Sequence, residues 1–184
     1  MGGVCSSARA LAEVAGNVTG SALLSAVLAE SNATPVKLAA RTLGNHPSLV
    51  LKLGRDAKGC AVLARVVLAT PKTGGDAFED FAAALAARAH ALAQHASGAV
   101  VVEAGLKHPF YRRSVALRLF GAGVNDLVAS AHGLAMLDAA VNSESDLAAA
   151  AAWVRAVMEH DALLPDARRA HWAKLAAATS SSLP

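Results

Sequence analysis

The chain of 184 residues has few aromatic residues, few cysteines and no long apolar run. Aromatic residues make up 4% of the sequence, so large rings supply little of any core. Cys5 and Cys60 are the only cysteines, which excludes a disulfide framework and fits a reducing compartment. No apolar run approaches the roughly 20 residues that span a bilayer, and the N-terminus lacks the apolar region of a secretory signal. We therefore expect an intracellular, soluble protein, or one attached to a membrane only through lipid.

The sequence also lacks the spacings of common catalytic and cofactor sites. His90 and His95 fall on different faces of a helix, and no paired cysteines accompany them, so a zinc site is not expected. No segment reads G-x-x-x-x-G-K-[ST], and "GAGVND" at 121–126 lacks the third glycine and the preceding strand of a dinucleotide site. No nucleophile–base arrangement rises above chance. These absences predict a protein that is not an enzyme and holds no metal or cofactor.

What the sequence does have is alanine, which supplies much of an apolar content of 54%. That content is typical of a folded chain. Alanine is the best helix former and carries little bulk, so it predicts short helices packed closely through small side chains. The net charge of +3 permits contact with nucleic acid or anionic lipid without demanding either.

Four segments repeat one pattern, a glycine followed by a small residue and an apolar run. They are "VTGSALLSAVL" (18–28), "AKGCAVLARVVLA" (57–69), "ASGAVVVEAGL" (96–106) and "AHGLAMLDAAV" (131–141). Their shared glycines, Gly20, Gly59, Gly98 and Gly133, recur at intervals of about 35–39 residues. A nearly constant interval in this range predicts a repeat architecture.

Each repeat is expected to hold three short helices: one before the glycine, one that starts at it, and one after a break. The first helices are predicted from "SLVLKLGRD" (48–56), "ARAHALAQHA" (87–96) and "GVNDLVASA" (123–131). "AVVVE" (99–103) is rich in β-branched residues, but its counterparts in the other repeats read as helical, so we expect a helix there too. Candidate helix caps are Thr34 before Pro35, Asp76 after the 70–75 loop, and Ser143 or Ser145.

The predicted fold is all-α, a curved α-solenoid of about four three-helix repeats in a single domain over 1–184. The repeats are expected at about 8–45, 46–87, 88–122 and 123–160, with a capping helix over 161–179. Arg168, Arg169 and Lys174 predict a polar outer face for that cap, and Trp172 is expected to pack back on the last repeat. No polar cap precedes the first repeat. The N-terminal end therefore either packs on something or belongs to a longer array.

The four glycine-led segments resemble the Pumilio (PUF) repeat. The best match is 54–69, followed by 92–108 and 127–142, with 13–30 weaker. HEAT-like and other helical repeats stay open, because all of them are built from short helices at similar periods. The resemblance implies a solenoid that binds single-stranded RNA, with about one base per repeat read by two or three side chains.

In that family the reading side chains are the first, second and fifth residues after the glycine. The resemblance therefore implies the sets Ser21, Ala22 and Ser25; Cys60, Ala61 and Ala64; Ala99, Val100 and Glu103; and Leu134, Ala135 and Asp138. These side chains are mostly methyl groups, none is aromatic, and two are acidic, so the usual code is largely absent. This departure is similar to the divergent nucleolar, Puf-A-like branch of the family, whose members are ribosome-assembly factors.

The basic residues fall mainly outside the second helices. Lys52 and three tentative phosphate contacts, Arg55, Lys58 and Arg65, surround the second repeat, while Arg112, Arg113 and Arg118 share one third helix. An arginine fork matches phosphate oxygens, although such residues also form ordinary solvated faces. We therefore expect an RNA- or ribonucleoprotein-binding scaffold with little base specificity. Ribosome assembly on ribosomal RNA in the nucleus or nucleolus is the first expectation.

An alternative arises at the N-terminus, "MGGVCSS". Gly2 with Ser6 matches the myristoylation pattern, and Cys5 is a candidate for palmitoylation. Two acyl chains would anchor the protein stably, whereas one would not. The alternative function is thus a protein-binding helical-repeat adaptor, cytoplasmic or held at a membrane by acylation.

Overall fold

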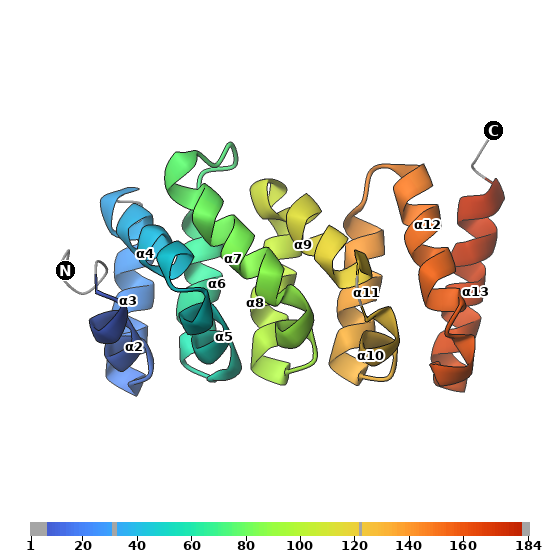
Figure 1. Ribbon diagram of the computed structural model, residues 1–184, viewed down its shortest axis with the longest axis horizontal. Helices are drawn as coiled ribbons and strands as arrows, with labels where there is room; N and C mark the ends of the chain where they lie inside the picture. The colour runs from blue at the N-terminus through green and yellow to red at the C-terminus, as the bar shows by residue number, and fades with distance from the viewer. Residues whose placement is uncertain (1–6, 31–32, 122, 182–184) are drawn as a thin grey trace.

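The computed structural model describes residues 7–30, 33–121 and 123–181, and within these ranges the chain is helical with no strand. The helices stand side by side from the N-terminal to the C-terminal end of an elongated array (Figure 1). The predicted fold class is confirmed: an all-α, curved α-solenoid of PUF-like repeats that ends in a capping helix. The "AVVVE" segment is helical, as its counterparts predicted.

Three helices recur along the array. The first helices are α2 (Ala8–Ala15), α5 (Pro47–Arg55), the C-terminal part of α7 (Asp76–Ala93) and α10 (Val124–Val128). The second helices are α3 (Val18–Ala29), α6 (Gly59–Ala69), α8 (Ala96–Lys107) and α11 (Ala131–Ser143). The third helices are α4 (Ala33–Asn45), the N-terminal part of α7, α9 (Pro109–Gly121) and α12 (Leu147–Met158). A 3₁₀ turn, η1 (Asp161–Leu163), leads to the cap, α13 (Asp166–Ser181).

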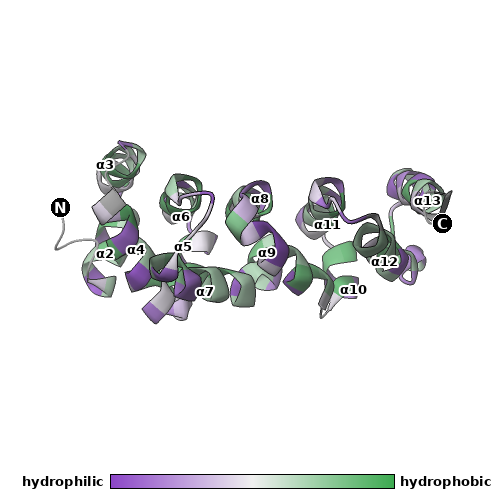
Figure 2. Cartoon of the chain, turned by 90° about the horizontal axis from the view of Figure 1, so that it is seen from above, coloured by the Kyte–Doolittle hydropathy of each residue, from purple (hydrophilic) through white to green (hydrophobic). Residues whose placement is uncertain are grey.

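The helices form two layers. Seen from above, α3, α6, α8 and α11 stand in one row with α13 at its end, and the first and third helices form the other layer (Figure 2). We call α3, α6, α8 and α11 the second-helix row. Successive members of this row contact one another, which is how each repeat covers the apolar side of its neighbour.

Helix α7 is longer than the sequence pattern indicated. It runs unbroken from Asp76 to Ala93, so the boundary expected between 87 and 88 lies inside one helix. The segment contains neither glycine nor proline, and its alanines favour continuing the helix. The equivalent point one repeat later is broken, and there Gly123 adopts a left-handed φ of 70° and its carbonyl oxygen lies 2.9 Å from Nε2 of His90.

The expected caps at Asp76 and at Ser143 or Ser145 are wrong. Asp76 is the first residue of α7 and follows Gly75, whose φ is 129°. The cap of α12 is Asp146, which accepts hydrogen bonds from the backbone N–H groups of Ala148 and Ala149 at 2.9 and 3.3 Å. The Ser143 hydroxyl instead donates to the carbonyl of Ala140 on its own helix. At the first site, Thr34 lies inside α4, which begins at Ala33.

One continuous apolar core follows the array. The fourth residue after each repeat glycine is buried in it: Leu24, Leu63, Val102 and Leu137. At the C-terminal end Trp172 is fully buried against this core, as expected of a capping residue. Arg168 and Lys174 are exposed on α13. Arg169 is only partly exposed, because it donates to the carbonyl of Leu164 and pairs with Asp166 at 3.1 Å.

No single helix among the described residues is both long and apolar enough to span a membrane. Helices α2 and α3 reach that length and composition only together, and a bend of 112° separates them.

Candidate nucleic-acid interface

The repeat glycines set the second-helix row in place. A Cβ on Gly59 would lie 2.7 Å from the carbonyl oxygen of Leu53, and one on Gly133 would lie 2.5 Å from that of Leu127. Gly20 and Gly98 meet the equivalent carbonyls of the first helix in the same way. The first and second helices of every repeat therefore cross at a contact that only glycine permits.

The residue three before the repeat glycine is the N-cap of the second helix in three repeats, namely Asn17, His95 and Ser130. In the second repeat α6 begins at Gly59 itself, and Asp56 lies in the turn before it. The side chains of Asn17, Asp56 and Ser130 accept hydrogen bonds from backbone N–H groups that include that of the repeat glycine. The two N–H donors from Gly59 and Lys58 hold the pKa of the Asp56 carboxyl below its usual value. The glycine contact recurs in all four repeats and keeps the second helices in phase, whereas the side-chain acceptor recurs in three, because His95 makes no such hydrogen bond.

This phase presents equivalent positions on the row. The second residue after each glycine is exposed in three repeats (Ala22, Ala61 and Val100) and partly exposed in the fourth (Ala135). The ninth is exposed in all four repeats: Ala29, Leu68, Lys107 and Asn142. The surface of the row is therefore made mostly of small or apolar side chains.

The expected reading positions do not all reach this surface. The first residue after the glycine is buried in every repeat: Ser21, Cys60, Ala99 and Leu134. The Ser21 hydroxyl donates to the carbonyl of Val18, and the Cys60 thiol lies 3.3 Å from the carbonyl of Ala57. Burial raises the pKa of the Cys60 thiol, and the nearby Asp56 charge adds to this effect. These side chains cannot serve a base edge where they stand.

The fifth residue after the glycine is partly exposed in three repeats. Ser25 shows this exposure in α3, whereas Ala64 is buried in α6. The Glu103 carboxylate pairs with the Lys107 ammonium group at 2.6 Å. The Asp138 carboxylate lies 2.8 Å from Nε2 of His171 on the capping helix. Both acidic side chains therefore have partners within the chain, which moderates the repulsion that they would exert on phosphate.

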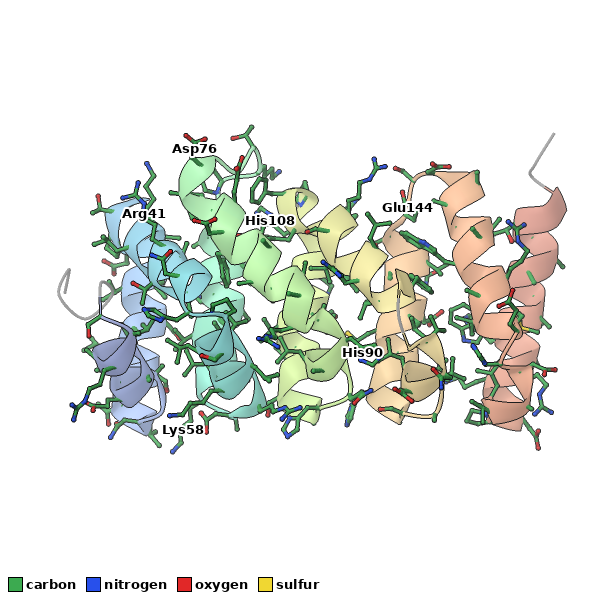
Figure 3. All side chains as sticks on the ribbon, in the orientation of Figure 1. Arg41, Lys58, Asp76, His90, His108 and Glu144 are labelled. Carbon is green, nitrogen blue, oxygen red and sulfur yellow. The ribbon has the colours of Figure 1, made fainter. Side chains whose placement is uncertain are left out.

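The expected phosphate contacts of the second repeat are exposed. Arg55 ends α5, Lys58 follows it in the turn to α6, and Arg65 stands on the surface of α6. Lys58 lies at the lower edge of the array in Figure 3. None of these three side chains forms an ion pair with another described residue. All three side chains are therefore available to an anion at the surface of the second repeat.

The three arginines of α9 lie in the other layer. Arg112 donates from Nε to the carbonyl of Leu106 at 3.0 Å and so satisfies a carbonyl group in the last turn of α8. Arg112 and Arg113 line a groove of about 250 Å³ together with Glu144, Asp146 and Trp153. Arg118 is exposed further along α9. The six candidate phosphate contacts therefore lie in two places, three around the second repeat and three on α9. The carboxylates of Glu144 and Asp146 line the same groove as two of the α9 arginines.

Sequence reasoning missed Leu68 and Lys107 on the surface of the row, and it named Val100 only as a reading position without the usual code. Leu68 and Val100 are exposed large apolar side chains on α6 and α8, about half accessible each. Lys107 adds a cation at the same surface. The signal was present in the spacing, because the ninth residue after each glycine falls two helical turns beyond the second.

The polar groups between the second and third repeats are structural. Tyr111 OH and the Thr70 hydroxyl are 2.8 Å apart, and Nε2 of His108 lies 2.9 Å from the Thr70 carbonyl oxygen. Burial raises the pKa of Tyr111 to about 12, against the opposing effect of its hydrogen bond to Thr70. This network fixes the loop after α6 to the start of α9.

The residues described by the structure contain no group of three His, Cys, Asp or Glu side chains placed to hold a metal ion. The candidate acylation residues Gly2 and Cys5 lie outside the described residues.

The solved structures that are similar to this chain include two of Puf4. The first is the Puf4 RNA binding domain bound to the HO endonuclease RNA 3′ UTR recognition sequence, with a TM-score of 0.68 and 11% identity, over 84% of this chain and 45% of that one. The second is a Puf4 double mutant bound to the Cox17 RNA 3′ UTR recognition sequence, with a TM-score of 0.70 and 13% identity, over 83% of this chain and 50% of that one. The chain thus spans about half the length of these domains. No protein-family model and no curated protein sequence matches it.

Proposed function

We propose that this protein binds RNA, as a helical-repeat scaffold for RNA or ribonucleoprotein particles and not as an enzyme. The observation that carries the proposal is the second-helix row, which shares its fold with two Puf4 domains bound to RNA. The exposed cations of the second repeat stand beside this row. An RNA strand could therefore meet helix surface and positive charge together.

The same row argues for little base specificity. Base reading needs polar groups at base edges and aromatic or arginine planes for stacking. The exposed second positions here are Ala22, Ala61, Val100 and Ala135, which offer neither. Binding should then depend on phosphate contacts, with Arg55, Lys58 and Arg65 as the principal side chains.

Scaffold roles of this kind suit ribosome assembly, and we propose ribosomal RNA as the partner and the nucleolus as the location. The support is the loss of the regular reading code, which the chain has in common with the nucleolar, Puf-A-like branch that the sequence resembles. Crosslinking in cells, followed by identification of the RNA, tests this finer proposal separately from RNA binding itself.

The central test measures RNA affinity against salt concentration. Purified protein should bind single-stranded RNAs of different sequence with similar affinity, and the affinity should fall steeply as salt rises. Replacing Arg55, Lys58 and Arg65 with Ala should weaken all RNAs about equally, and flatten the salt slope by roughly one unit per lost phosphate contact. The matched control replaces Lys37, Arg41 and Lys72, three exposed cations elsewhere, and should leave the slope unchanged.

Two results would contradict the proposal. Tight binding to one short motif, lost on replacing Ser25 and Glu103, would show a base-reading protein. Equal losses from both triple variants would show that net charge alone attracts RNA and that the second repeat has no special part.

A second candidate function is protein binding at the same row, and the exposed Leu68 and Val100 favour it. Apolar side chains that line a solenoid surface are typical of protein contacts. If no RNA binds, proteins crosslinked in cells should map to α6 and α8. Replacing Leu68 and Val100 with Glu should then remove those crosslinks. If the variant kept the same crosslinks as the wild type, protein binding at this row would be excluded.

A further inference from the structure

The third helices of successive repeats pack against one another except at one place. Helix α4 packs on α7 and α7 packs on α9, but among the described residues α9 and α12 have no comparable contact. Figure 1 shows these two helices standing apart in the array. The groove of about 250 Å³ opens between them. It lies in the layer opposite the second-helix row (Figure 2), so a ligand in it would leave the proposed RNA surface free.

Part of the groove lining is apolar. Leu117 of α9 lines the groove and is 52% exposed. Trp153 of α12 also lines it, and the Trp153 ring stacks on the Phe120 ring with the centroids 4.8 Å apart and the planes at 6°. The stack holds the tryptophan in one orientation. The apolar lining is therefore formed before any ligand arrives, which lowers the cost of binding.

Opposite charges line the two sides of the groove without meeting. Arg112 and Arg113 belong to α9, whereas Glu144 and Asp146 belong to the start of α12, where Figure 3 labels Glu144. No ion pair between described residues joins the two sides. Both carboxylates accept hydrogen bonds from backbone N–H groups at the start of α12, which hold them on that side. Arg113 and Leu117 are one helical turn apart, so charge and apolar surface adjoin on α9.

These features favour a peptide over the other ligands of a solenoid. The carboxylates repel the phosphates of a nucleic acid strand. The groove is smaller than the roughly 300–1,000 Å³ of small-molecule sites, so it does not enclose a free metabolite. An extended peptide needs to place only one side chain in the groove while the rest of it crosses the surface, and its neighbouring side chains supply charges of both signs.

We propose that the groove between α9 and α12 binds a short extended segment of a partner protein. An apolar side chain of the segment packs on Leu117 and Trp153. An acidic side chain pairs with Arg113, and a basic side chain faces Glu144 and Asp146. The two charged sides fix which way round the segment lies. The protein then holds RNA on one layer and a protein partner on the other, which goes beyond RNA binding alone.

Selection from a random peptide library displayed on phage, against the immobilised full chain, tests the proposal. Enriched peptides should share an apolar residue with an acidic and a basic residue close to it. A synthetic peptide of the enriched sequence should change the fluorescence emission of Trp153. The other tryptophan, Trp172, is fully buried and lies outside the groove lining, so its emission should stay constant.

Calorimetric titration of that peptide into variants then identifies the site. Arg113→Glu and Leu117→Glu should each weaken binding about tenfold, the first by charge repulsion and the second by loss of the apolar contact. The matched control is Arg155→Glu, at an exposed arginine of α12 that does not line the groove, and it should bind like the wild type. A peptide with lysine in place of its acidic residue should prefer the Arg113→Glu variant to the wild type.

Circular dichroism should show the same helical spectrum and melting temperature for all three variants, because each change is at an exposed side chain. The proposal is overturned if the selection enriches no sequence, if Arg155→Glu weakens binding as much as Arg113→Glu, or if the lysine peptide shows no such preference. Displacement of the peptide by single-stranded RNA would overturn it too. A failure of RNA to bind at the second-helix row would leave this result unchanged, so the two proposals fail separately.

Discussion

At the scale of single residues, the four repeat glycines are defined by what surrounds them. Each faces the carbonyl oxygen of the residue six positions earlier, on the first helix of its own repeat. Backbone atoms cannot move aside as a flexible side chain can. The recurrence of glycine in the sequence therefore records one backbone contact made four times, and this is why the repeat could be detected despite the low identity to solved solenoids.

Gly133→Ala should destabilise the protein. The added Cβ would lie 2.5 Å from the carbonyl oxygen of Leu127, so the first and second helices of the last repeat must separate. Overpacking of this kind costs about 1–3 kcal/mol, which chemical denaturation would measure. Gly121→Ala is the control, since nothing lies within 4 Å of its Cβ. Equal stability of the two variants would show that the helix crossing is not tight.

Leu63→Ala should also lower the free energy of unfolding. Leu63 is fully buried in the core between repeats, and truncating such a residue costs about 2–5 kcal/mol. The equivalent changes at Val102 and Leu137 should be destabilising as well. Leu68→Ala, at an exposed position of the same helix, should change the unfolding free energy little. Neutral results at all three buried sites would mean that the repeat register is incorrect.

At the scale of helices, the sequence predicted which segments are helical better than where each helix ends. The glycine phase predicted the second helices, including the β-branched run 99–103 that forms part of α8. The unbroken α7 could not be predicted, because the repeat pattern demands a break near 87 while the local residues favour helix. The cap at Asp146 was missed because three polar residues, Ser143, Ser145 and Asp146, compete over one short turn.

Asp56→Ala should weaken the start of α6, where the carboxylate accepts hydrogen bonds from Lys58 and Gly59 at 2.9 and 2.7 Å. Loss of a side-chain acceptor of this kind at a helix start costs about 0.5–2 kcal/mol at neutral pH. The pKa of Asp56 is lowered in the folded state, so its contribution is present above the unfolded value of 3.8 and is lost as pH falls through the folded pKa. Thermal melts of both proteins across acidic pH should therefore converge. A gap that widens on acidification would contradict this account.

At the scale of the whole molecule, the candidate interface could be predicted only in part. The sequence indicated which residues are basic and which positions follow each glycine. It could not show that α9 lies in the other layer. There Arg112 donates to a carbonyl in the last turn of α8, and Arg113 lines a groove with Glu144 and Asp146. The placement of a side chain on a solenoid depends on how each helix is rotated about its axis, and small side chains fix that rotation only through packing.

The last prediction concerns how stability is shared along the array. In a solenoid each repeat contacts only its neighbours, so damage at one end should remain there. Trp172 is a fully buried residue of the capping helix α13. Trp172→Ala should lower the local free energy of unfolding by about 3–5 kcal/mol. Native-state hydrogen exchange should then show loss of protection in α11, α12 and α13, with α3 and α6 close to wild type. Leu24→Ala, which opens a buried site in α3 at the other end, is the matched control and should give the reverse pattern. A uniform loss of protection in either variant would mean that the molecule unfolds as one unit and that its ends are coupled.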